Sequence, residues 1–262
     1  MNASFSDQTA AGSVDKVAKV TLAFWLMKIC ATTVGETGGD LLSMTLKVGY
    51  AISSLILLAF FVVTLIAQLR SKRFHPALYW LVILSTSTAG TTISDFMDRT
   101  LGLGYATGAL LISGVLIAVL AAWRLTYGSL KVDHIREPGV ETFYWLAILA
   151  SNTLGTALGD FLADTSGLGY LWSNALISGG IALTILAWKF TRISSTVLFW
   201  IAFVLTRPFG ATMGDLLTKS HEKGGLDLGT NGSTLTLLAE LCVLLIATTA
   251  NYRQWFTRGR PA

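Results

Sequence analysis

The sequence predicts an all-α polytopic membrane protein with eight transmembrane helices, arranged as four parallel two-helix repeats in a pseudo-symmetric bundle. Its 262 residues are 53% hydrophobic and only 13% charged, whereas soluble domains carry about 25% charged residues. The apolar residues also form long runs, as in 51–68, 106–122 and 175–188. Each run approaches the ~20 residues that a helix needs to cross a bilayer. The third observation is an internal repeat.

The repeat is marked by tryptophan, glycine and aspartate at fixed spacing. The tryptophan follows another aromatic residue in every copy: Trp25, Trp80, Trp145 and Trp200. A glycine stands ten residues later: Gly35, Gly90, Gly155 and Gly210. An aspartate stands fifteen residues after the tryptophan: Asp40, Asp95, Asp160 and Asp215. Gly-Tyr follows the first three aspartates, and the fourth copy has a longer loop that reaches Gly229-Thr230.

This spacing divides the chain. We expect repeats at 18–71, 72–126, 141–191 and 192–252, with a flexible polar tail at 1–17 and a basic tail at 253–262. The polar linker 127–140 contains Pro138-Gly139 and is the predicted seam between two halves. The first fifteen residues lack the basic and apolar regions of a cleavable signal peptide. Cys30 and Cys242 lie in apolar segments and are expected to be free thiols.

Within each repeat, the first helix is predicted to run from just before the tryptophan to just past the aspartate, and the second begins at Gly-Tyr. Lysine and arginine concentrate in the connectors that follow the second helices. The positive-inside rule therefore places both termini in the cytoplasm. Since every repeat crosses twice, all four repeats have the same orientation.

With these features the sequence resembles a bacterial family of inner-membrane proteins that have four tandem two-helix repeats, a characteristic tryptophan and no known function. The resemblance covers the chain from Trp25 to Ala250. It implies the topology and a multi-pass location in the bacterial inner (plasma) membrane. It implies no activity and no cofactor, so the cofactor stays unknown.

Polar residues lie along the first helix of each repeat. The four tryptophans are predicted to be interfacial anchors. The aspartates then lie about 22 Å deeper, in the outer half of the membrane. Thr33, Thr88 and Thr153 precede three of them by two turns. Lipid cannot form hydrogen bonds with these hydroxyl and carboxyl groups. We therefore expect the stripe of polar residues on each first helix to face the interior, and the four stripes to converge on a cation site. Its candidate metal ligands are Glu36, Asp40, Asp95, Asp160 and Asp215.

Two other readings of these residues stay open. Each aspartate can instead accept hydrogen bonds from the free backbone N–H groups of the following helix and staple the hairpin. Three charges break the symmetry of the repeats: Glu36, Arg207 and Glu240. Arg207 and Glu240 have similar depths on consecutive helices, so we predict an intramembrane ion pair between them, with Glu36 as the remaining acid. Lys28 is expected to extend to the inner interface.

The function most consistent with this pattern is a transporter or channel for a small cation, either a hard metal ion or a proton-coupled one. The expected partners are the lipid bilayer and that cation. The alternative is a non-transporting scaffold or sensor. The sequence has no catalytic motif and we predict no enzyme. Nucleic-acid binding is not expected, because the basic residues are spread over four connectors.

Overall fold

The computed structural model describes residues 16–132, 135 and 137–258. In this part of the chain, eight long helices follow one another. They are α1 (Leu22–Asp40), α2 (Tyr50–Arg70), α3 (Pro76–Asp95), α4 (Tyr105–Tyr127), α5 (Pro138–Asp160), α6 (Gly169–Phe190), α7 (Ser195–Thr218) and α8 (Thr230–Arg258). The predicted all-α fold with two helices per repeat is confirmed.

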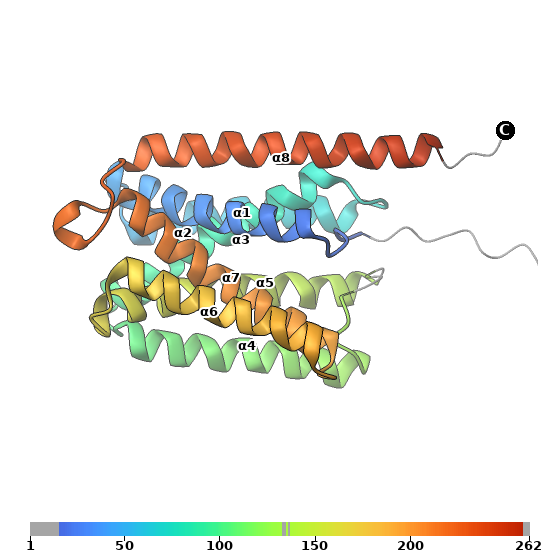
Figure 1. Ribbon diagram of the computed structural model, residues 1–262, viewed down its shortest axis with the longest axis horizontal. Coiled ribbons are helices and arrows are strands. Elements are labelled where there is room, and N and C mark those ends of the chain that lie inside the picture. The colour runs from blue at the N-terminus through green and yellow to red at the C-terminus, as the bar shows by residue number, and fades with distance from the viewer. Residues whose placement is uncertain (1–15, 133–134, 136, 259–262) are drawn as a thin grey trace, which may run out of the picture.

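The four odd-numbered helices form a closed inner ring. α1 packs against α3 and α7, and α5 packs against the same two helices from the other side. Each even-numbered helix packs chiefly against the odd helix of the next repeat: α2 on α3, α4 on α5 and α6 on α7. α8 completes the cycle by packing on α1, beside which it runs along one edge of the bundle (Figure 1). The four repeats therefore form one pseudo-symmetric bundle.

The inner and outer helices differ in what they expose. The outer helices present large apolar side chains, including Leu55, Val63, Leu110, Leu183 and Ile246. Among the described residues, six helices are long and apolar enough to cross a membrane: α2, α4, α5, α6, α7 and α8. α1 and α3 carry buried charges or many hydroxyl groups, which face the protein interior. The chain is thus a multi-pass membrane protein whose polar residues are gathered inside the ring.

The repeated glycine is the point where neighbouring inner helices touch. A Cβ atom on Gly35 would lie 2.1 Å from the hydroxyl of Ser87, and one on Gly210 would lie 2.4 Å from that of Thr32. Gly90 meets Asn152 and Gly155 meets Arg207 in the same way. Each glycine therefore contacts the residue seven positions after the tryptophan of the next repeat. Any side chain here would push the inner helices apart.

The hairpins are held by backbone geometry. In the first three repeats the aspartate ends the α-helix, and one π-helical turn follows: η1 (Leu41–Thr45), η2 (Phe96–Thr100) and η3 (Phe161–Thr165). Gly49 and Gly104 then adopt φ values of +83° and +72°, which only glycine enters readily. Their N–H groups donate to the carbonyls of Ser43 and Asp98. The fourth hairpin is longer and contains the short η4 (His221–Lys223).

Parts of the predicted tails and linker lie outside the described residues, namely 1–15, 133–134, 136 and 259–262. Two residues assigned to the N-terminal tail are nevertheless buried. Lys16 and Val17 lie against the bundle, and the Lys16 ammonium is 2.7 Å from the carboxylate of Glu141. The linker also contacts the bundle, since the Trp200 indole donates to the carbonyl of Leu130.

Candidate ion site on the bundle axis

The inner helices bury side chains at five positions spaced four residues apart, which follow one ridge of each helix. From the tryptophan end they form an aromatic layer (Phe24, Tyr79, Tyr144, Phe199), a lysine layer (Lys28, Ile83, Ile148, Phe203) and an arginine layer (Thr32, Ser87, Asn152, Arg207). A glutamate layer (Glu36, Thr91, Thr156, Ala211) and an aspartate ring (Asp40, Asp95, Asp160, Asp215) follow. All twenty side chains are at most 9% exposed. A buried polar column therefore leads from mid-bundle to the aspartate end.

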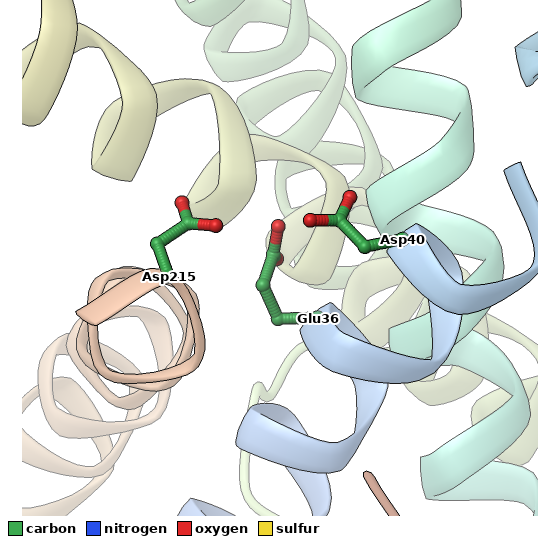
Figure 2. Close-up of side chains that lie close together, drawn as sticks. All are labelled: Glu36, Asp40 and Asp215. Atoms are coloured by element: carbon green, nitrogen blue, oxygen red, sulfur yellow. The ribbon is translucent and has the colours of Figure 1, made fainter. Parts of the chain in front are cut away.

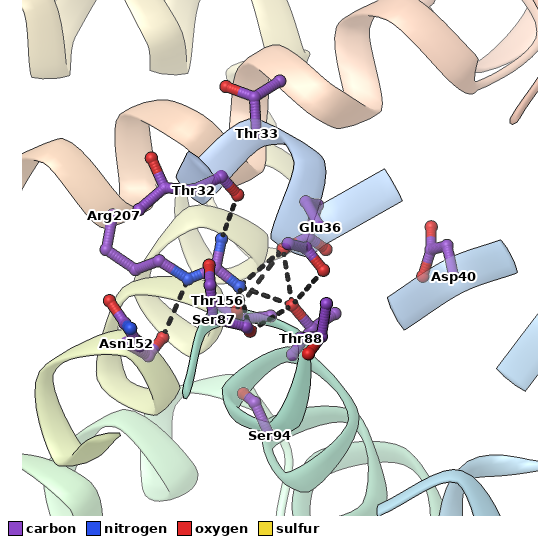
Figure 3. Close-up of polar contacts among 12 residues, drawn as sticks. Thr32, Thr33, Glu36, Asp40, Ser87, Thr88, Ser94, Asn152, Thr156 and Arg207 are labelled. Atoms are coloured by element: carbon purple, nitrogen blue, oxygen red, sulfur yellow. Dashed lines mark hydrogen bonds and ion pairs between the residues drawn. The ribbon is translucent and has the colours of Figure 1, made fainter. Parts of the chain in front are cut away.

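Arg207 occupies the centre of this column and contacts all three other inner helices. Its guanidinium lies 3.0 Å from the Glu36 carboxylate. It also donates to the hydroxyls of Thr91 and Thr156, at 2.5 Å and 2.6 Å. Its remaining N–H groups reach the carbonyls of Thr32 and Asn152 (Figure 3). One fully buried side chain thereby ties α7 to α1, α3 and α5.

Glycine provides the space for this arginine. A Cβ atom on Gly155 would lie 2.2 Å from Cγ of Arg207 and 2.5 Å from its Cβ. The corresponding glycines face the smaller side chains of Ser87, Asn152 and Thr32. Gly155 is therefore needed both to leave room for the Arg207 side chain and to let α5 and α7 pack closely.

The predicted ion pair between Arg207 and Glu240 is wrong. Glu240 is exposed on the outer side of α8, and the partner of Arg207 is Glu36. The prediction assumed that consecutive helices pack as a hairpin, but α8 packs on α1. The acid regarded as unpaired is thus the one that neutralises the arginine. Glu240 is left as a carboxyl group on the lipid-facing side.

Lys28 is a second buried cation, one level below Arg207. Its ammonium donates to the side-chain carbonyl of Asn152 at 3.1 Å and lies 4.2 Å from the centroid of the Phe203 ring. The amide of Asn152 in turn donates to Thr86 at 2.9 Å. The expected extension of Lys28 to the interface is wrong, because the side chain is fully buried. Its spacing of four residues from Thr32 and eight from Glu36 was the signal for its place in the column.

The four aspartates are brought together in two bridged pairs. The Lys219 ammonium lies 2.5 Å from Asp40 and 3.0 Å from Asp215. The Arg99 guanidinium lies 2.8 Å from Asp95 and 3.3 Å from Asp160. Both cations were absent from the candidate residues, although each stands one helical turn after an aspartate.

A group of three carboxyl groups could hold a metal ion. Glu36, Asp40 and Asp215 each offer an oxygen, and these oxygens all lie within 4.8 Å of one another (Figure 2). Oxygen donors of this kind suit hard cations. Lys219 contacts two of the three groups, so its ammonium takes the place that a small cation would occupy.

Lys219 follows the end of α7, and its environment keeps it charged. Burial by itself lowers the pKa of this ammonium, but the carboxylates of Asp215 and Asp40 outweigh burial and raise the pKa above its ordinary value. The Lys219 ammonium therefore stays protonated throughout the neutral pH range.

The aspartates do not staple the hairpins. No side chain caps the start of α2, α4 or α6. Their carboxylates face the bridging cations instead. Backbone hydrogen bonds close the first two of these turns, where the N–H groups of Gly49 and Gly104 donate to the carbonyls of Ser43 and Asp98.

The three threonines of the predicted stripe have local partners. Each donates to the carbonyl four residues earlier in its own helix, Thr33 at 3.0 Å, Thr88 at 3.1 Å and Thr153 at 3.0 Å. They stand one residue after the arginine layer, and one residue turns a helix by about 100°. The axial hydroxyls are instead those of Thr91 and Thr156.

Three of the four tryptophans predicted as interfacial anchors are instead buried within the bundle. Trp80, Trp145 and Trp200 are at most 7% exposed, and Trp25 is half-buried. They pack edge-on or tilted against rings of the aromatic layer, as Trp145 does against Tyr79. Burying these large rings between helices is favoured over leaving them at the interface.

Carboxyl groups outnumber the cations that contact them. Glu36 and the four aspartates share three cationic partners, Arg207, Arg99 and Lys219. Lys28 faces the neutral Asn152. When all five carboxyl groups are ionised, their charge exceeds that of the cations in contact with them by two, and uncompensated charge in a buried site is costly.

Comparison with known proteins agrees with this internal symmetry. Four segments, 23–74, 78–129, 143–194 and 198–254, match the Repeat of Unknown Function (DUF347). The chain belongs to this family. Each DUF347 segment contains one tryptophan–glycine–aspartate set and one inner helix with its following outer helix. No curated protein and no solved structure matches the chain.

Proposed function

We propose that this DUF347 protein moves a small cation, a hard metal ion or a proton-coupled one, as a transporter or channel. The observation that supports the proposal is the charge imbalance of the axial site. Its five buried carboxyl groups contact only three cations. Two protons, or one divalent cation, would complete the neutralisation.

The carboxyl groups would act at two levels. Glu36, Asp40 and Asp215 are the metal-binding set, and the hydroxyls of Thr91 and Thr156 lie beside Glu36. Asp95 and Asp160 form the second pair on the ring. Intramembrane carboxyl groups commonly serve as ion or proton relays.

The topology belongs to the same proposal. Connectors at the tryptophan end hold most of the lysines and arginines, so we assign that end, and with it both termini, to the cytoplasm of a bacterial inner membrane. The aspartate ring then faces the outer side. We further propose no enzymatic activity and no nucleic-acid partner.

Flux measurements in proteoliposomes test this function. Purified protein would be reconstituted with an internal pH dye or a Mg²⁺- or Mn²⁺-sensitive dye. The variants are Glu36→Gln and Asn replacements of Asp40, Asp95, Asp160 and Asp215, one at a time. We expect the Glu36, Asp40 and Asp215 variants to lose most of the flux.

Asp98→Asn is the matched control. Asp98 is a buried carboxyl group on η2 that accepts from Ser94, and Arg99 forms its ion pairs with Asp95 and Asp160 rather than with Asp98. It should leave flux unchanged. Equal flux in the wild type, all four aspartate variants and the Glu36 variant would rule out transport through this site.

A scaffold or sensor is the second candidate, and the Arg207 network favours it. The Arg207 guanidinium forms hydrogen bonds with three neighbouring helices and occupies the centre of the bundle. Such an arrangement holds the helices together without requiring transport. On this alternative the same variants would lower thermal stability, and neither they nor the wild type would carry flux.

A further inference from the structure

The cations at the aspartate ring come from only two of the four repeats. Nineteen residues after the tryptophan, the second and fourth repeats have Arg99 and Lys219. The first and third have Met44 and Asp164 at this position. The ring therefore has four aspartates, one from each repeat, but only two cations, from alternate repeats.

Each of these two cations forms ion pairs with aspartates of two different repeats. Arg99 pairs with Asp95 of its own repeat and with Asp160 of the third repeat. Lys219 pairs with Asp215 of its own repeat and with Asp40 of the first repeat. Both bridges thus join one half of the molecule, repeats one and two, to the other half, repeats three and four.

The same two boundaries have other contacts farther from the aspartate end, among them the fully buried Arg207–Glu36 ion pair one layer away. At the tryptophan end the hydroxyls of Tyr79 and Tyr144 are 2.6 Å apart at one boundary, and the rings of Phe24 and Phe199 meet at the other. A cation cannot compete for aromatic contacts. It can compete for the carboxylates that hold the halves together at the aspartate end.

The bridging cations are also the ones able to leave. The side chains of Arg99 and Lys219 are 31% and 15% exposed, whereas that of Arg207 is fully buried. A long basic side chain at the water boundary can turn its head group outward at small cost. Releasing Arg207 would leave Glu36 unpaired in the interior.

We propose that Arg99 and Lys219 form a gate at the aspartate end and compete with the incoming cation for the same carboxylates. When a cation neutralises Asp40 and Asp215, or Asp95 and Asp160, the bridging side chain is released. With both bridges broken, the two halves separate at this end and the axis opens. The inference rests on the proposed cation transport, and it assigns that site its regulation.

Thiol accessibility tests the gate without measuring flux. Ser94 is fully buried on α3, directly before Asp95 in the sequence, and its hydroxyl donates to Asp98. Its replacement by cysteine changes little in size. In a Cys30→Ala, Cys242→Ala background, Ser94→Cys would be titrated in detergent micelles with a sulfonated maleimide, which reaches both ends of the protein.

The expected result is a slow reaction in this background. Labelling should be about tenfold faster when Arg99→Met and Lys219→Met are combined, which corresponds to roughly 1.4 kcal/mol. The charge-preserving pair Arg99→Lys and Lys219→Arg should restore protection. In the background protein, millimolar Mg²⁺ should also accelerate labelling.

The matched control is Ser85→Cys, at an equally buried serine whose partner is Thr64 of α2. This thiol should stay protected in every variant. Acceleration at both positions would mean general loosening and would overturn the gate. Unchanged labelling of Ser94→Cys in the double methionine variant would overturn it as well.

Should the double variant not fold, the response to Mg²⁺ in the background protein decides, and a labelling rate independent of Mg²⁺ rejects the gate. The two proposals remain distinguishable. Flux that depends on Glu36 combined with unresponsive labelling keeps transport and rejects the gate. Responsive labelling without flux in any protein rejects transport.

Discussion

Consider a double-mutant cycle on the pair at the centre of the bundle, made of Glu36→Gln, Arg207→Met and their combination. The two charged groups are 3.0 Å apart, and their side chains are 4% and 0% exposed. Removing one partner of such a pair leaves an uncompensated buried charge and typically costs about 3–5 kcal/mol. Arg207→Met should be the more harmful single change, because it also leaves the carbonyls of Thr32 and Asn152 without this donor.

The double variant buries neither charge. Its loss of stability should therefore be smaller than the sum of the single losses by about 0.5–3 kcal/mol, the usual range for directly coupled groups. Unfolding in micelles, followed by circular dichroism across a titration with sodium dodecyl sulfate, measures all four proteins. Single losses that add within about 0.3–0.5 kcal/mol would refute the pairing, because that is the behaviour of independent sites.

The glycine and lipid-facing positions give further predictions. Gly155→Ala should lower stability by about 1–3 kcal/mol, because its Cβ would overlap Arg207. Its control, Gly179→Ala on α6, has open space around the new Cβ and should be neutral or stabilising by about 0.5–1 kcal/mol; equal thermal shifts for the two would count against the packing argument. Glu240→Leu removes an exposed carboxyl group from mid-α8 and should increase stability by up to ~2.5–3.5 kcal/mol. Its flux should equal that of the wild type, and a transport defect in this variant would show that Glu240 acts in the path.

The repeat made the architecture predictable. A glycine and an aspartate recurring at constant distance from a tryptophan require equivalent surroundings in each copy, and the ring of inner helices supplies them. The aspartates and Glu36 were identifiable as interior groups, since lipid cannot satisfy them. Thr33 was assigned to the axial face because seven residues nearly complete two helical turns. The inner helices instead meet along the ridge of residues four apart, which passes through Thr32.

Tertiary packing set the limit of the prediction. Nothing local to Arg207 indicates that α8 packs on the first repeat, so its true partner could not be chosen over Glu240. Tryptophan is a residue typical of membrane interfaces, and only the ring contacts between neighbouring repeats show that these side chains point inward. Lys219 lies in the one hairpin that departs from the repeat, where its position could not be inferred by symmetry.

The contact between α8 and α1 has a consequence for biosynthesis. α1 is the first of the described helices to leave the ribosome, and its outer cover is the last of them. α2, α4 and α6 each find their partner as soon as the next repeat is inserted, but α1 must wait for the whole series. Until then the side of α1 that α8 later covers is unpacked, and Glu36 and Asp40 lack the basic partners that the fourth repeat supplies. The carbonyls that Arg207 binds also lack this donor. Assembly is therefore completed by a single closing event, and a chain interrupted before α8 would present an open seam to membrane proteases.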